Sequence, residues 1–146
     1  MSGYADTSFL VSLYTQDANS MEATQVLLDR KTPVLVTPFG EAEFVNSVEQ
    51  RVFRKEISSS QAETSLLAFQ RDLDAASFLI GRSVPGHTYA RAILLSRQHT
   101  RSLGTRGMDI VHVAIALELK ATDLFTFDKD QAKLAKRTGL AVRPGR

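Results

Sequence analysis

The segment MDIVHVAIALELKATDLFTFD, residues 108–128, decides the fold class of this chain. Its first part, residues 108–120, is almost wholly apolar after the first turn, which predicts a helix buried in the core. Its second part, residues 123–127, has the length and composition of a buried strand, and Asp128 follows it directly. A buried helix that leads into a buried strand is typical of α/β domains with a parallel sheet.

The rest of the chain repeats this alternation of short apolar runs and longer segments of helical period. Further strands are predicted at residues 3–5, 33–37, 78–80 and 140–142. Further helices are predicted at residues 8–14, 18–29, 39–54, 58–73, 88–98 and 131–137. The serines at 58–60 with Glu63 predict a capping box, and Gly81 with Pro85-Gly86 is expected to close the apolar run at 78–80. No repeat or linker divides the chain, so residues 1–146 are predicted to form one domain, a central, mostly parallel sheet with helices on both faces.

Composition excludes several classes of function. Cysteine is absent, which rules out a disulfide framework, a thiolate metal site, an iron–sulfur cluster and a thiol nucleophile. The N-terminal residues 1–14 lack the basic region and apolar run of a signal peptide. No apolar stretch approaches the ~20 residues that a membrane span needs. We therefore expect a soluble, cytoplasmic protein that does not enter a membrane.

The charge of the chain is unevenly distributed. Residues 1–81 hold 6 Lys and Arg against 11 Asp and Glu, a net charge of −5, and residues 82–146 hold 12 against 5, a net charge of +7. An acidic cation site beside a surface that attracts phosphates explains this pattern, and a chance distribution is the alternative. Candidate phosphate contacts are Arg51, Arg54, Lys55, Arg82, Arg97, Arg101, Arg106, Lys129, Lys133, Lys136 and Arg137. Arg106 and Lys129 are favoured because each lies close in sequence to a candidate site acid.

Acidic residues are placed where a parallel sheet binds ligands, beyond the carboxyl ends of its strands. Asp6 follows the first predicted strand and Asp128 the fourth, while Asp109 lies in the first turn of the buried helix. Glu43, with Glu41 two residues earlier, lies in the helix after the second strand. Carboxylates gathered in one crevice repel each other, and a divalent cation relieves the repulsion. Carboxylates and water are the ligands that Mg²⁺ and Mn²⁺ prefer, and one or two such ions could cleave a phosphodiester.

Each acid also has a purely structural explanation. Asp6 before a helix is a natural N-cap, and Asp109 is favoured near a helix start by the helix dipole. Asp128 fits a turn or cap, and Glu43 fits a solvated helix face. The hypothesis of an active site therefore depends on the joint placement of the four residues.

Four motifs resemble those of PIN-domain proteins, in order and over nearly the whole chain. They are YADTSFLV at 4–11, TPFGEAEF at 37–44, MDIVHVAIAL at 108–117 and LFTFDKD at 124–130, the last followed by Leu134-Ala135 and Gly139-Leu140. The chain length also resembles that of VapC-type toxins from bacterial toxin–antitoxin pairs. Gly3 departs from the pattern, because apolar residues are common at this point of the first strand.

The resemblance implies a PIN fold and a Mg²⁺- or Mn²⁺-dependent endoribonuclease that cuts RNA and is bound by a cognate antitoxin. The implied metal ligands are Asp6, Glu43, Asp109 and Asp128. Glu43 matches the family better than Glu41, because an apolar residue follows it. Hydroxyl residues that orient the site are implied at Thr7 or Ser8 and at Thr126.

Two further groups of residues have competing interpretations. His112, on the same helix face as Asp109, is interpreted as a hydrogen-bonded core histidine rather than a substrate contact. The apolar residues of the first helix could form the face of a homodimer, with core packing as the default. They are Phe9, Leu10, Leu13 and Tyr14.

Other functions fit the sequence less well. A P-loop NTPase lacks its glycine-rich motif here. An aspartyl-phosphate phosphatase would need an Asp two residues after Asp6, where the chain has Ser8, and a receiver domain would need an Asp within residues 35–60. A PIN-like protein that binds RNA or a partner without cutting is the remaining alternative, and the complete set of acids argues against it.

Overall fold

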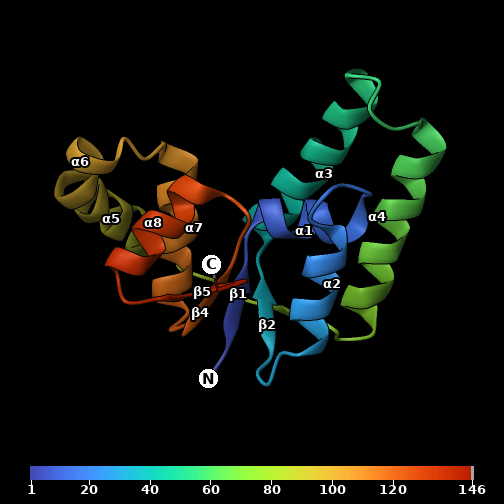
Figure 1. Cartoon of the computed structure of the whole chain (residues 1–146). Helices are drawn as coiled ribbons and strands as arrows, with labels where there is room; N and C mark the ends of the chain where they lie inside the picture. The colour runs from blue at the N-terminus through green and yellow to red at the C-terminus, as the bar shows by residue number, and fades with distance from the viewer. Residues whose placement is uncertain (146) are drawn as a thin grey trace.

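The computed structural model describes residues 1–145 as a five-stranded sheet between two layers of helices (Figure 1). The strands are β1 (Gly3–Ala5), β2 (Val34–Val36), β3 (Leu79–Ile80), β4 (Asp123–Phe125) and β5 (Ala141–Arg143). The helices are α1 (Thr7–Tyr14), α2 (Ser20–Leu28), α3 (Pro38–Phe53), α4 (Ser59–Asp74), α5 (Pro85–Leu95), α6 (Arg101–Leu103), α7 (Gly107–Glu118) and α8 (Lys129–Arg137). A wider helical turn, η1 (Ser96–Thr100), joins α5 to α6.

Successive side chains of the strands point into two different cores. Tyr4 of β1 and Leu124 of β4 pack with α5, α7 and α8 on one face of the sheet. Ala5 of β1 and Phe125 of β4 pack with α1, α2, α3 and α4 on the other face. This alternation follows from the two-residue period of a strand. The structure confirms the predicted α/β fold with helices on both faces.

The order of the strands creates a crevice at the middle of the sheet. All four strand pairs are parallel, and the order is β3-β2-β1-β4-β5. The chain therefore begins at the centre, moves outward through β2 and β3, and returns to the other side of β1 to add β4 and β5. Parallel sheets bind ligands at such a reversal, so a binding site is expected at the carboxyl ends of β1 and β4.

Gly3 in β1 is explained by its neighbour on β4. A Cβ atom built on Gly3 would lie 2.4 Å from Cε2 of Phe125, closer than real Cβ atoms approach a ring carbon. Phe125 is 3% exposed and packs edge-on against Phe9 at a ring distance of 5.3 Å. The glycine thus makes room for the Phe125 ring in the core below the carboxyl ends of β1 and β4.

Several predicted boundaries and one predicted cap differ from the structure by a few residues. β4 ends at Phe125, not at residue 127. The Thr126 amide still donates to the Arg143 carbonyl of β5 at 2.9 Å, but the next amide, that of Phe127, donates to Ser8 Oγ at 2.9 Å. The capping box of α4 pairs Ser58 with Gln61 rather than with Glu63. α5 begins at Pro85, since proline fits the first turn of a helix.

The first helix does not offer the dimer face considered above. Phe9 and Leu10 are fully buried in the core of the same chain, and Leu13 and Tyr14 pack against that core. Core packing, the default interpretation, is confirmed for these residues. Among residues 1–145, no helix is both long and apolar enough to cross a membrane.

Candidate active site

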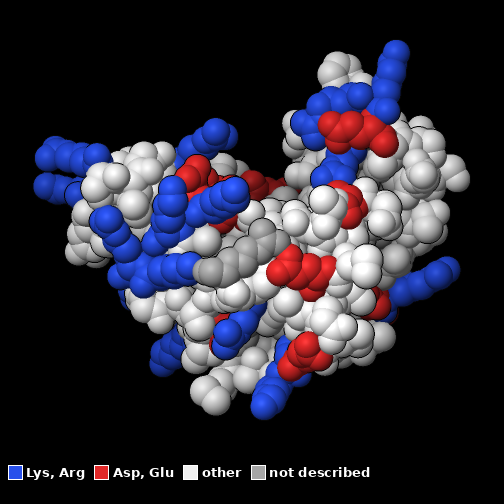
Figure 2. All heavy atoms as spheres, viewed as in Figure 1, with Lys and Arg blue, Asp and Glu red and all other residues white. Residues whose placement is uncertain are grey.

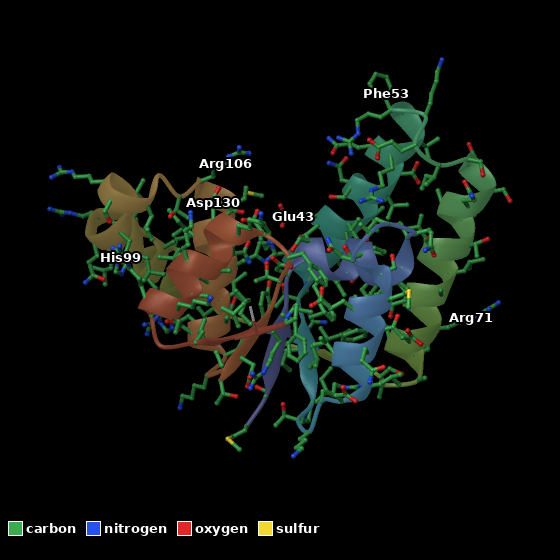
Figure 3. All side chains as sticks on the ribbon, in the orientation of Figure 1. Glu43, Phe53, Arg71, His99, Arg106 and Asp130 are labelled. Carbon is green, nitrogen blue, oxygen red and sulfur yellow. The ribbon has the colours of Figure 1, made fainter. Side chains whose placement is uncertain are left out.

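A cleft of about 450 Å³ opens at the carboxyl ends of β1 and β4. All four predicted acids line it: Asp6, Glu43, Asp109 and Asp128. Figure 2 shows acidic atoms in the hollow between the two groups of helices, while Lys and Arg side chains crowd over the group formed by α5 to α8. In Figure 3, Glu43 lies in this hollow. Four distant segments of the chain thus bring their carboxylates to one depression.

Asp6 is both a helix cap and a wall of the cleft. It is 1% exposed, and its carboxylate accepts hydrogen bonds from the Phe9 amide at 2.9 Å and from Ser8 Oγ at 2.7 Å. Thr126 Oγ1 donates to the other carboxylate oxygen. Burial raises the pKa of Asp6, and the charge of His112 together with these hydrogen bonds opposes the rise. The capping role and the place in the cleft therefore coexist, with Ser8 and Thr126 fixing the carboxylate.

Glu43 is held by a buried chain of polar groups. Thr7 Oγ1 donates to Glu43 Oε1 at 2.8 Å, and His112 Nε2 contacts the same oxygen. The other ring nitrogen of His112 lies 2.7 Å from the Tyr4 hydroxyl. Burial raises the pKa of Glu43, but the hydrogen bond and charge of His112 and the hydrogen bond from Thr7 outweigh it and leave the pKa below its ordinary value. Glu43 is therefore ionised at neutral pH.

His112 confirms its interpretation as a hydrogen-bonded core residue. It is 3% exposed, and its ring centroid is 4.8 Å from that of Phe39. Its ring connects Tyr4, deep in the sheet, with Glu43 at the cleft surface. This linkage was not predicted, because no motif joins residues so far apart in the chain.

Asp109 and Asp128 face each other closely enough to affect ionisation. Burial and the negative charge of Asp128 raise the pKa of Asp109 to about 6, and the charge of Asp6 adds to the rise. His112 and Arg106 oppose it. Asp128 is the N-cap of α8 and accepts from the amides of its first turn. A carboxyl whose neighbours resist its ionisation marks a place where positive charge would be favoured.

The raised pKa of Asp109 predicts a pH-dependent stability. In the unfolded chain this carboxyl titrates near 3.8, and in the folded protein at about 6, so the folded state binds the proton more tightly. Its contribution to stability is therefore complete below pH 3.8 and is lost as the pH rises through about 6. Thermal melts in EDTA across this range should show a steeper fall in Tm for the native protein than for Asp109→Asn. Equal slopes would contradict the assignment.

The carboxylates do not form a preorganised metal-coordination site among the described residues. Among residues 1–145, no three His, Asp or Glu side chains stand in a geometry that could hold one metal ion together. The reason is local: Asp6 is bonded to hydroxyls, Glu43 to His112, and Asp128 to the amides of α8. Mg²⁺ keeps several waters and binds through one or two carboxylates, so the donor set still suits that ion.

The remaining predicted residues lie at different distances from the cleft. Thr7 and Ser8 line it, whereas Glu41 is not among the residues of its wall, so the geometry favours Glu43 over Glu41. Arg106 is exposed at the start of α7, beside Asp109. Lys129 lines a separate hollow of about 300 Å³ that shares Asp128 with the cleft.

Arg51 shows what sequence reasoning missed. It was considered a phosphate contact, but it lines the cleft in an ion pair with Asp17 at 3.4 Å and donates to Thr15 at 3.0 Å. Asp17 was not singled out, since it lies in a loop outside the four motifs. Its charge partner on α3 becomes visible only in the folded chain.

The fold and the cleft together define the class: an α/β domain with an acid-lined site where its parallel sheet reverses direction. A family model described as PIN domain matches residues 4–137. The chain belongs to the PIN domain family, which confirms the resemblance of its motifs.

Solved structures with the same fold come from several bacteria. VapC20 from Mycobacterium tuberculosis, a sarcin–ricin loop cleaving toxin, is 15% identical with a TM-score of 0.68, over 90% of this chain and 93% of that one. VapBC-1 from nontypeable Haemophilus influenzae is 14% identical with a TM-score of 0.65, over 98% and 97%. VapBC2 from Rickettsia felis, bound to a promoter DNA fragment, is 16% identical with a TM-score of 0.65, over 98% of each chain. No curated protein matches the chain in sequence.

Proposed function

We propose that this protein is a Mg²⁺- or Mn²⁺-dependent endoribonuclease. The observation that carries the proposal is the convergence of four carboxylates, from β1, α3, α7 and the end of β4, on one cleft at the reversal point of the sheet. Membership of the PIN domain family supports it. The absence of cysteine and of a free histidine in the cleft wall favours hydrolysis without a covalent intermediate.

Asp6, Glu43, Asp109 and Asp128 would hold the proposed ion, directly or through water. When bound, a divalent cation polarises the phosphoryl oxygen and activates water. The protein's own side chains prepare the site before the ion arrives. Ser8 and Thr126 fix Asp6, and His112 with Thr7 keeps Glu43 ionised.

Asp109 is the residue whose proton responds to the ion. Its pKa is about 6, so a fraction of the molecules carry a proton there near neutral pH. Asp109 would release that proton on binding of a divalent cation beside Asp128 and Asp6. We therefore expect metal affinity to increase with pH through the same range.

We propose further that the protein acts as the toxin of a toxin–antitoxin pair. The fold likeness to VapC20 and to the VapBC structures supports this assignment. It implies a cognate antitoxin as partner. A homodimer remains part of the proposal, with its interface elsewhere than on the buried residues Phe9 and Leu10.

The function is tested by Mg²⁺- and Mn²⁺-dependent cleavage of structured RNAs, including a sarcin–ricin stem-loop. We expect cleavage by the native protein and its loss in Asp6→Asn, because asparagine keeps the capping oxygen of α1 but removes the charge. Asp130→Asn is the matched control, since Asp130 is an exposed acid of α8 outside the cleft wall.

The alternative function is RNA or partner binding without cutting. Tight RNA binding by the native protein, with no products under either metal, would support that alternative. The same assay with single-stranded and duplex DNA asks whether the cleft discriminates against substrates without a 2′-hydroxyl.

A further inference from the structure

The His112 ring contacts Glu43 from inside the core. It is 3% exposed, and its centroid lies 4.8 Å from that of Phe39 and 5.7 Å from that of Tyr4. Its Nε2 atom contacts Glu43 Oε1, and Thr7 Oγ1 lies 3.3 Å from the same nitrogen. A ring enclosed in this way offers little surface to a substrate, so its influence on the cleft passes through Glu43.

The neighbours of Nε2 determine where the ring carries a hydrogen. An ionised carboxylate such as that of Glu43 can only accept hydrogen bonds. The Thr7 hydroxyl already donates its proton to Glu43 Oε1 at 2.8 Å, so it too can only accept from the ring. The His112 ring therefore carries a hydrogen on Nε2, whether it is neutral or charged, and donates it to Glu43.

The opposite ring nitrogen is held by Tyr4. This tyrosine is fully buried, and its hydroxyl lies 2.7 Å from Nδ1 of His112. The hydroxyl pairs with Nδ1 in either state of the ring, as donor to a neutral ring and as acceptor from a charged one. The same hydroxyl lies 3.4 Å from Oγ1 of Thr37, the N-cap of α3. A turn of the ring would leave a buried nitrogen unpaired, so Tyr4 fixes its orientation.

The two donors leave one oxygen of Glu43 without a partner. Thr7 and His112 both contact Oε1, whereas Oε2 makes no hydrogen bond or ion pair with residues 1–145. The Glu43 side chain is 24% exposed and lines the cleft. Oε2 is therefore the oxygen available to a ligand in the cleft, and the contacts of Oε1 decide where it lies.

We propose that His112 and Tyr4 are positioning residues, which hold the Glu43 carboxylate so that Oε2 can take a divalent cation in the cleft. The inference rests on the proposed function in one respect: the ligand of Oε2 is Mg²⁺ or Mn²⁺. Hydrogen bonds that orient a metal ligand commonly contribute about 10- to 100-fold in metal affinity. His112 lies three residues after Asp109 on α7, so one helix supplies a site acid and orients another.

The test measures Mn²⁺ binding to the full chain without RNA, by electron paramagnetic resonance of the free ion and by calorimetry. We expect His112→Asn to weaken Mn²⁺ binding by roughly tenfold or more. The asparagine nitrogen is as many bonds from the backbone as Nδ1, so it can reach Tyr4 but not Glu43. The glutamine nitrogen matches Nε2 in this respect, so His112→Gln should restore most of the native affinity. Equal losses in the two variants would overturn the proposal, because they would indicate a general packing defect.

A double-mutant cycle separates an effect that passes through Glu43 from any other. In a Glu43→Ala background, His112→Asn should cause no further loss of Mn²⁺ affinity, because the carboxylate that the ring orients is gone. Tyr4→Phe should likewise weaken binding in the native background and not in Glu43→Ala. Losses of the same size in both backgrounds would overturn the proposal.

His99→Asn is the matched control. His99 belongs to η1 and is not among the residues of the cleft wall (Figure 3). The same substitution there should leave Mn²⁺ affinity unchanged. A loss as large as that of His112→Asn would show that the affinity responds to stability alone and would contradict the positioning role.

A measurement without metal distinguishes failure of this inference from failure of the proposed function. Nitrogen-15 NMR of the native protein in EDTA should show a hydrogen on Nε2 of His112 that exchanges slowly with water, and exchange should be faster in Glu43→Ala. An Nε2 atom without a hydrogen would overturn the inference alone. Native protein that shows this hydrogen but binds no Mn²⁺ would overturn the proposed metal dependence, and with it the role of Oε2.

Discussion

Asp109→Asn is expected to lower metal-dependent RNA cleavage by at least about 100-fold and, in the same protein, to raise Tm at neutral pH in EDTA. The loss follows because even residues that only support metal ligands commonly cost 10- to 100-fold when replaced. The gain follows because Asp109 ionises against burial and against the charge of Asp128, which together raise its pKa to about 6. Asparagine keeps the shape of the side chain and removes the repulsion.

These opposite signs distinguish a site acid from a structural one. Asp130→Asn, on the exposed face of α8, should change neither quantity beyond the small effect of its ion pair with Lys133 at 3.7 Å. Added Mg²⁺ should raise the Tm of the native protein more than that of Asp109→Asn. An Asp109→Asn protein that melts earlier than the native one, yet still cuts RNA, would contradict the proposed role.

Gly3→Val is expected to destabilise the fold by about 1–3 kcal/mol, or more if the core cannot adjust. The new Cβ would overlap the ring of Phe125, which is 2.4 Å from that position and is enclosed by the core. Urea or thermal unfolding of the metal-free protein measures the change, and a fall in Tm of several degrees is expected for a chain of this size.

Gly86→Ala is the control for this substitution. A Cβ on Gly86 meets no atom within 4 Å, and the residue lies in the first turn of α5. Alanine in a helix is favoured over glycine by roughly 0.5–1 kcal/mol, so stability should be unchanged or slightly higher. If Gly3→Val unfolds like the native protein, the close approach of β1 to the Phe125 ring is not a real constraint of the fold.

Much of the architecture could be predicted because the local signals agree with the tertiary structure. The segment at 108–128 is apolar where α7 and β4 are buried, and the helix predicted at 39–54 is α3 within one residue at each end. The acids could be predicted because the ends of parallel strands converge at one edge of a sheet. Asp6 and Asp128 follow such ends in sequence, so their common cleft follows from the topology.

The errors arise where side chains compete with the backbone. The end of β4 was misplaced because the amides of Phe127 and Asp128 donate to the hydroxyls of Ser8 and Thr126 instead of to a neighbouring strand. The contact between Phe127 and Ser8 joins residues 119 positions apart, so no local pattern predicts it. The pairing of Tyr4 with His112 spans 108 residues and likewise leaves no local pattern. Sequence periodicity reports on burial, whereas these polar contacts depend on the packing of the whole domain.

Asp6 caps α1 and also lines the cleft, so its replacement during evolution is restricted by both roles. A descendant that abandons catalysis still needs a side chain that closes the start of α1 and satisfies the hydroxyls of Ser8 and Thr126. Asparagine, serine and threonine meet part of that need, and aliphatic residues meet none of it. Inactive descendants should therefore retain a small polar residue at position 6, and drift more freely at position 109, where no cap depends on the carboxylate.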